Sequence, residues 1–272
     1  MIEIEEMRFG YPKQVPLFDR LRLRMGTGSI TGLLGKNGAG KTSLIKIISG
    51  LLFPSAGNVT VIGHNPRRRH PSFLRELFFV PEEFHFPHVT IRQFITANSP
   101  FYHRFDLKLM DHLLHEFELP QDKHIHKLSY GQKKKFLISF SLASRCRLLV
   151  LDEPTNGLDI PSKVVFRKVM AGTLDEDQLV IISTHQVRDV ENLIDRIVIL
   201  DEGKVILEKD IAEISSQLQF SHSTVPDGDM VLYSEMVPGG YKIITPQING
   251  NSSVDIELLF NAVTSGKKIF KA

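Results

Sequence analysis

Short apolar runs, bounded by glycine, proline and polar residues, recur along the chain and predict the strands of a buried sheet. Between them, apolar residues recur at helical spacing in 91–97, in 107–117 and in the stretch that ends at Ser144. Strands that alternate with helices are typical of an α/β protein. The apolar runs are 29–34, 77–80, 148–151 and 179–182.

Both ends of the chain show other patterns. Near the N-terminus, apolar and charged residues alternate in 2–5 and in 21–24, which predicts strands at the edge of the sheet. After about Lys209, segments 231–233 and 242–244 flank a Pro-Gly-Gly turn and predict a hairpin. A helix is predicted in the stretch that begins at Val254. We expect it either to pack on the core for stability or to belong to a regulatory or dimer-supporting domain.

A glycine-rich loop lies between the strand predicted at 29–34 and a short helix predicted at 44–49. It matches G-x-x-x-x-G-K-[ST], which predicts a phosphate-binding loop when it joins a strand to a helix. Its glycines would let backbone N–H groups surround phosphate oxygens. Lys41 would reach the β- and γ-phosphates, and the Thr42 hydroxyl would hold Mg²⁺. The loop residues are Gly35, Lys36, Asn37, Gly38, Ala39, Gly40, Lys41, Thr42 and Ser43.

Polar side chains follow two of the apolar runs directly. Asp152 and Glu153 come after 148–151, and His185 comes shortly after 179–182. Ligands of open α/β sheets bind at the carboxyl ends of the strands, so we expect these side chains at one edge of the sheet. There Asp152 would hold Mg²⁺, directly or through water, and Glu153 would polarise the attacking water. His185 would contact the γ-phosphate.

The segment Leu128-Ser129-Tyr130-Gly131-Gln132 leads into the helix that ends at Ser144. Ser129 is a favourable N-cap residue, so this helix offers a second N-terminus to an anion. Three lysines follow, at 133–135, and we expect them on solvated turns of the helix rather than in a nucleic-acid patch.

Composition narrows the class of protein. The 272 residues are enough for one large domain with an appendage, and a net charge of +2 predicts no bulk attraction to nucleic acid or anionic lipid. The single cysteine, Cys146, excludes an internal disulfide and suits a reducing cytosol; we interpret it as a bystander rather than a catalytic thiol. No run of 18 apolar residues occurs, and the acidic N-terminus lacks a signal region. We therefore expect a cytosolic protein.

Tyr11 and the basic run 67–70 each allow two interpretations. Tyr11 could stack on a nucleotide base or pack within its turn. The basic run 67–70 could be a nucleic-acid patch or a solvated loop, and we favour the loop. The aromatic stretch 84–88 is expected to be exposed and therefore to mark a contact site. Its histidines, together with His124 and His126, lack the spacing of a zinc site.

The motifs together resemble those of the nucleotide-binding subunit of ABC transporters, over about residues 1–215. The phosphate loop GKNGAGKT, the signature LSYGQ, the Walker B strand LLVLDEPTNGLD and the switch histidine of STHQ occur in the family's order. The resemblance implies a P-loop NTPase of α/β class. It would have a RecA-like core sheet, an N-terminal antiparallel β-subdomain and a helical subdomain inserted at about 83–145. Residues 216–272 would then form a small α+β accessory domain.

The resemblance further implies a dimer that binds ATP and Mg²⁺. In the family, the signature of one subunit completes the ATP site of the other, so Ser129, Gly131 and Gln132 would bind nucleotide in trans. Asp159 would couple the two sites, and Tyr11 would stack on adenine. The implied partner is a membrane-embedded permease. The subunit would bind it from the cytoplasm, at the inner face of the cell membrane. No nucleic-acid partner is expected. The short helical insert and the DEPTNGLD wording are most similar to ABC-2 exporter ATPases.

Two residues depart from the family's pattern. Glu82 stands where the family usually has Gln; a carboxylate there could still ligate Mg²⁺ but brings negative charge beside phosphates. Tyr130 stands where Gly is commoner, so its ring must point away from the nucleotide or contact the partner subunit.

Two other functions are compatible with parts of this pattern. A soluble ABC ATPase acting on ribosomes or DNA usually carries two nucleotide domains or a long coiled coil, and neither occurs in this sequence. A P-loop kinase would not need LSYGQ or the arrangement from DEP to His185.

Overall fold

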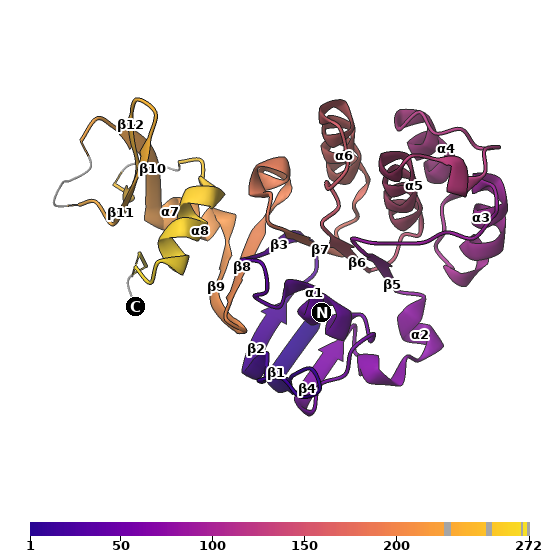
Figure 1. Cartoon of the computed structure of the whole chain (residues 1–272), viewed down its shortest axis with the longest axis horizontal. Helices are drawn as coiled ribbons and strands as arrows, with labels where there is room; N and C mark the ends of the chain where they lie inside the picture. The colour runs from indigo at the N-terminus through magenta and orange to yellow at the C-terminus, as the bar shows by residue number, and fades with distance from the viewer. Residues whose placement is uncertain (226–229, 249–251, 268, 271–272) are drawn as a thin grey trace.

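We describe the protein from a computed structural model, which describes residues 1–225, 230–248, 252–267 and 269–270. Three sheets organise the chain (Figure 1). The central sheet has six strands in the order β5-β6-β7-β3-β8-β9; the first five are parallel, and β9 pairs antiparallel with β8. Its strands are β3 (Ser29–Gly35), β5 (Leu77–Val80), β6 (Leu148–Asp152), β7 (Leu179–Thr184), β8 (Arg196–Asp201) and β9 (Lys204–Asp210).

The four predicted apolar runs are therefore confirmed as the neighbouring strands β3, β5, β6 and β7. Every residue of β6 and β7 is buried. Strands covered on both faces need apolar residues throughout, which is why these two appear as uninterrupted runs rather than as alternating patterns.

A separate antiparallel sheet forms near the N-terminus, in the order β2-β1-β4. It consists of β1 (Ile2–Phe9), β2 (Phe18–Met25) and β4 (Ala56–Val61), so these strands do not lie at the edge of the central sheet as predicted. Their buried residues, among them Ile2 and Ile4, pack in one core with helix α1 (Lys41–Ile48) and with Leu33 of β3. This core holds the phosphate loop between the two sheets.

A helical region lies between β5 and β6 and occupies one end of the molecule (Figure 1). The aromatic stretch at its start is less exposed than predicted. Phe84 and Phe86 are half-buried, because Phe86 packs on Phe136 at 5.6 Å between ring centroids, and only His85, Pro87 and His88 are exposed. The region contains α3 (Ile91–Asn98), α4 (Leu107–Glu116) and α5 (Tyr130–Ala143), with 3-10 turns η2 (Ser99–Phe101) and η3 (Ile125–Lys127).

Helix α6 (Ile160–Thr173) follows β6, and two 3-10 turns, η4 (Val187–Asp189) and η5 (Glu191–Leu193), follow β7. Before β5 come η1 (Pro66–Arg68) and α2 (Pro71–Leu74). The basic run 67–70 thus forms a turn and a helix start, where the Arg69 guanidinium donates to the Gly50 carbonyl at 2.7 Å.

The C-terminal part forms the third sheet and two helices at the opposite end from α3 to α5 (Figure 1). The predicted hairpin is present, although its first strand begins only at Tyr233, and the last helix lies close to its predicted place. Strand β10 was not predicted. The elements are α7 (Ile211–Gln217), β10 (Leu218–Ser223), β11 (Tyr233–Val237), β12 (Gly240–Pro246) and α8 (Ile256–Thr264). No helix in the part of the chain that the structure describes has the length and apolarity to cross a membrane.

Candidate functional site

The phosphate loop connects the end of β3 to the start of α1. Gly40 has a φ of 106°, a left-handed conformation, and a Cβ there would lie 2.8 Å from the Phe18 ring. Only glycine meets both constraints, and it lets the chain turn directly into the helix. The helix consequently begins at Lys41, earlier than the predicted Leu44.

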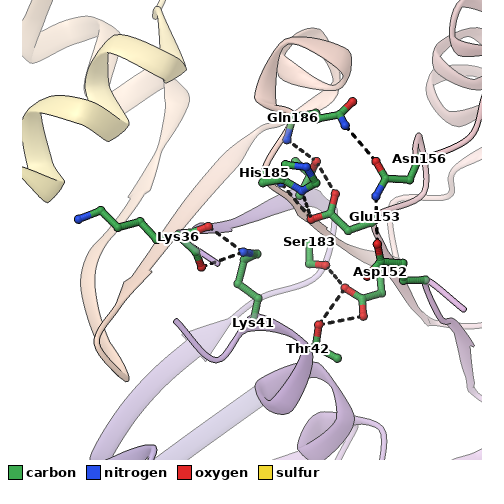
Figure 2. Close-up of polar contacts among 12 residues, drawn as sticks. Lys36, Lys41, Thr42, Asp152, Glu153, Asn156, Ser183, His185 and Gln186 are labelled. Carbon is green, nitrogen blue, oxygen red and sulfur yellow. Dashed lines mark hydrogen bonds and ion pairs between the residues drawn. The ribbon is translucent and has the colours of Figure 1, made fainter. Parts of the chain in front are cut away.

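Lys41 places its amine inside the loop. Its Nζ donates to the carbonyls of Gly35 at 2.7 Å and Lys36 at 3.2 Å (Figure 2). Burial lowers the pKa of Lys41, and the carboxylates of Glu153 and Asp152 act in the opposite direction. A partly desolvated cation held against backbone carbonyls can exchange those contacts for phosphate oxygens, to which its hydrogen bonds are stronger.

Asp152 lies at the end of β6 and faces the first turn of α1. Its Oδ2 accepts a hydrogen bond from the Thr42 hydroxyl at 3.1 Å, and its Oδ1 accepts one from the Ser183 hydroxyl (Figure 2). A hydroxyl and a carboxylate oxygen side by side, next to a phosphate loop, are the donor set that Mg²⁺ prefers when phosphates and water complete its octahedron. The residues present therefore fit a magnesium ion.

Glu153 is buried and hydrogen-bonded through both carboxylate oxygens. Its Oε1 accepts from the His185 backbone N–H at 3.0 Å and lies 2.7 Å from the His185 Nδ1, while its Oε2 accepts from the Thr184 hydroxyl at 3.0 Å (Figure 2). The carboxylate is thus fixed by three groups at the end of β7. The sequence predicted contact between His185 and phosphate, which stays a prediction; in this structure the ring contacts Glu153 and is placed to orient that carboxylate.

A cavity of about 590 Å³ joins the phosphate loop to these side chains. Tyr11 stands at its edge, 40% exposed, and its hydroxyl lies 3.0 Å from the Ser43 hydroxyl. No described residue of the signature segment 128–132 lines the cavity. The lining residues are Tyr11, Gln14, Val15, Leu17, Asn37, Gly38, Gly40, Lys41, Thr42, Ser43, Glu82, Glu153 and His185.

The signature segment caps α5, as predicted for Ser129. The Ser129 hydroxyl accepts from the Gln132 N–H at 3.2 Å, and the Gln132 side chain accepts from the Ser129 N–H at 3.1 Å. Ser129 is exposed, and Gly131 follows it in the first turn. Asp159 caps α6 in the same way by accepting from the Ser162 N–H at 3.0 Å, and hydrogen bonds from Ser162 lower the pKa of Asp159.

Tyr130 packs within its own chain. Its hydroxyl donates to the Glu82 carbonyl at 2.7 Å, and its ring stacks on Phe84 at 5.3 Å between centroids. The ring also lies over Gly157, where a Cβ would be only 2.6 Å from it. Tyr130 does not line the nucleotide cavity of its own chain, and it is 45% exposed, so contact with a partner subunit stays a prediction.

The sequence analysis missed a polar chain that links three loops. The Asn156 amide donates to Glu82 Oε1 at 3.1 Å, and the Gln186 amide donates to Asn156 Oδ1 at 3.1 Å (Figure 2). Asn156 belongs to the tight connection after β6, and Gln186 follows the switch histidine. In the sequence, only the position of Asn156 and Gln186 close to the predicted site residues could have indicated this contact.

Glu82→Gln is expected to leave ATP turnover unchanged or to raise it. The amide oxygen of Gln can accept from Asn156 as Oε1 of Glu82 does, and the substitution removes a negative charge beside the phosphate site. Steady-state phosphate release checks this, with the exposed neighbour substituted in Glu83→Gln as the matched control. A loss beyond about tenfold, equal to roughly 1.4 kcal/mol, would show that the carboxylate has a required role of its own.

Lys134 contradicts the prediction of solvated lysines on α5. Its side chain is fully buried, whereas Lys133 and Lys135 are half-exposed. Cys146 is also buried, and burial raises the pKa of its thiol to about 12, which agrees with a thiol that takes no part in chemistry.

Comparison with known proteins identifies a protein family whose model matches this chain. The family model described as "ABC transporter" matches residues 18–156. The ABC transporter ATP-binding protein YtrB of Bacillus subtilis is 26% identical, over 98% of this chain and 99% of its own length. The SkfA peptide export ATP-binding protein SkfE of the same species is 28% identical, over 76% of this chain and 88% of its own length.

Among solved structures, the ATP-binding subunit of an ABC transporter superposes with a TM-score of 0.70 at 24% identity. The match covers 79% of this chain and 91% of that structure. At this identity the likeness shows the fold: a P-loop NTPase of α/β class.

Proposed function

The chain belongs to the ABC transporter family, and on this premise we propose that it is the ATP-hydrolysing subunit that powers export through a separate membrane permease. One observation carries the proposal: Lys41, Thr42, Glu153 and His185 line a single cavity at the carboxyl ends of the central strands, and Asp152 is hydrogen-bonded to Thr42 beside it. The resemblance of SkfE, a peptide export protein by name, favours export over import.

In the proposed reaction, the phosphate loop binds the triphosphate and Lys41 contacts its β- and γ-phosphates. Mg²⁺, held by Thr42 and Asp152, would neutralise charge on the phosphate oxygens. Glu153 would orient the attacking water and accept its proton, and His185 would keep the carboxylate in place. Tyr11 would stack on adenine at the edge of the cavity.

We propose that a second copy of the chain completes each site. The cavity lacks any contribution from signature residues of its own chain among the described lining residues, and Ser129 is exposed at the start of α5. The free N–H groups of a helix N-terminus attract anions. Ser129, Gly131 and Gln132 of one copy would therefore bind the γ-phosphate held by the other, with Asp159 at the interface.

We propose that the C-terminal residues 216–272 form an accessory domain beside η4, the turn that follows the switch histidine His185. Arg188 of η4, close to the switch histidine, pairs with Glu257 of α8 at 2.6 Å. The similarity to YtrB extends through this part of the chain, since it covers 98% of the sequence. Buried residues of α8, among them Leu259, belong to the same core as β6 and β7, so this helix packs on the core. We propose that its contact with η4 gives it a regulatory or dimer-supporting role in addition.

The proposed permease would hold the subunit at the inner face of the cell membrane. The surface beside Glu82, which includes the exposed His85 and His88, would receive its cytoplasmic segment. Affinity purification of the tagged chain from detergent-solubilised native membranes is expected to recover an integral membrane protein. A variant with His85→Glu and His88→Glu should recover less of it while binding ATP normally. Recovery of ribosomal proteins or nucleic acid instead would favour the soluble ATPase and overturn the proposal.

A further inference from the structure

Among the residues that the structure describes, one buried charged side chain has no part in the proposed reaction, that of Lys134. This residue lies in the second turn of α5, four positions after Tyr130, and its side chain is completely inaccessible. It does not line the nucleotide cavity. A buried charge is costly unless hydrogen-bond partners compensate its lost solvation, so the surroundings of this amine should explain why it is there.

Three backbone carbonyls surround the amine. Nζ of Lys134 donates to the carbonyls of Pro81 at 3.2 Å, Glu82 at 3.4 Å and Asp152 at 3.4 Å. An ammonium group has three N–H donors and no acceptor, so the three carbonyls match its protonated form. The Phe84 ring covers it, with Nζ 5.5 Å from the ring centroid.

Burial acts to lower the pKa of Lys134, and the nearby carboxylates of Asp152, Glu82 and Glu153 oppose the change.

The contacts join segments that are distant in the sequence. Pro81 and Glu82 follow β5, and Asp152 ends β6 directly before Glu153. Tyr130 and Lys134 lie on one face of α5 because they are four residues apart, and both donate to the Glu82 carbonyl. Phe84 contacts both of them, stacked on the Tyr130 ring and beside the Lys134 amine. The first two turns of α5 are thereby fastened to the segment after β5 and to the end of β6.

We propose that Lys134 is a positioning residue for ATP hydrolysis, which fixes the signature-bearing start of α5 to the strand end that carries Asp152 and Glu153. This inference rests on the proposed function. In the proposed dimer the signature serves the partner's nucleotide and Glu153 serves the chain's own, so the hydrogen bonds of Lys134 would connect the two ATP sites through one chain. Removing the Lys134 amine should displace both the signature residues and Glu153 while leaving the phosphate loop unchanged.

The first test compares Lys134→Met with Lys133→Met. Met retains an unbranched apolar stem and lacks the ammonium. Lys133 is the neighbouring half-exposed lysine, and its side chain makes no hydrogen bond or ion pair with the described residues. Turnover is normalised to the fraction of protein that binds nucleotide, so that misfolded protein does not count. For Lys134→Met we expect kcat to fall at least about tenfold, equal to roughly 1.4 kcal/mol, with KM for ATP changed less than about twofold, because the start of α5 and the end of β6 lose their connecting hydrogen bonds. Lys133→Met should match the wild type.

A second measurement separates positioning from a purely structural role. In a Glu153→Gln background, which is expected to form dimers with ATP and Mg²⁺, adding Lys134→Met should reduce dimer formation while nucleotide binding persists. Absence of dimers in Glu153→Gln alone would count against the proposed function. Dimers in both backgrounds, with wild-type kcat for Lys134→Met, would overturn only the role of Lys134.

Two milder variants keep the inference testable if Lys134→Met does not fold. Lys134→Gln retains an N–H₂ donor without the charge and should give an intermediate kcat. Tyr130→Phe removes one donor to the Glu82 carbonyl while leaving the ring on Phe84, and should lower kcat by a smaller factor. Wild-type kcat in both variants would contradict the proposed fastening of α5.

Discussion

The Glu153→Gln variant is expected to bind ATP as tightly as the wild type and to lose roughly 100-fold to 10,000-fold of its turnover, the usual contribution of a general base. The amide keeps the shape of the carboxylate and an oxygen that can accept from the His185 N–H. It cannot accept a proton from water. ATP held without hydrolysis should leave two copies closed over it, so dimers should accumulate with ATP and Mg²⁺.

Phosphate release, equilibrium ATP binding and light scattering measure these three outcomes. Glu202→Gln is a matched control: Glu202 is exposed in the turn between β8 and β9, and its φ of 45° equals that of Glu153. The two variants therefore carry the same change of Glu to Gln at residues with the same φ. Persistent full turnover in Glu153→Gln would remove Glu153 from the role of base.

Lys41→Ala is expected to weaken ATP binding by roughly 10-fold to 150-fold, because the variant loses the charged hydrogen bonds of the amine to phosphate. In the protein as described, the Lys41 amine donates only to the carbonyls of Gly35 and Lys36. These groups belong to a loop whose backbone is already shaped by Gly40, so the loop should survive the substitution.

Titration calorimetry with ATP tests this result, and Lys46→Ala in the last turn of the same helix is the control. Lys46 does not line the nucleotide cavity, so its variant should bind ATP normally. Equal affinities for the two variants would show that the nucleotide is bound elsewhere.

The sequence predicted the central sheet and the ends of its strands because both depend on local chemistry. β6 and β7 are buried on both faces, so their composition alone identifies them. The residues placed after them then meet at one edge by topology, which brings Asp152 and Glu153 to the phosphate loop. The alternation placed the N-terminal strands at the edge of the central sheet, which was wrong because alternation reveals a half-buried strand but not its neighbours. The separate antiparallel sheet implied by the family resemblance is confirmed.

Other features depend on contacts that no local pattern records. Lys134 belongs to a run of three lysines, and which of them is buried is decided by carbonyls after β5 and β6. The burial of Phe86 likewise depends on Phe136, far along the chain. Strand β10 was missed because its residues are mostly half-exposed and show no clear alternation.

The inaccessibility of Cys146 makes this protein convenient for site-directed fluorescence. Because Cys146 is 1% exposed and burial raises the pKa of its thiol to about 12, the native cysteine should stay unmodified when a maleimide dye is added to the folded protein. A single cysteine introduced at an exposed place such as Met236 would then carry the whole label. Energy transfer between donor-labelled and acceptor-labelled copies could then measure, in real time, the association and dissociation of two subunits during ATP hydrolysis.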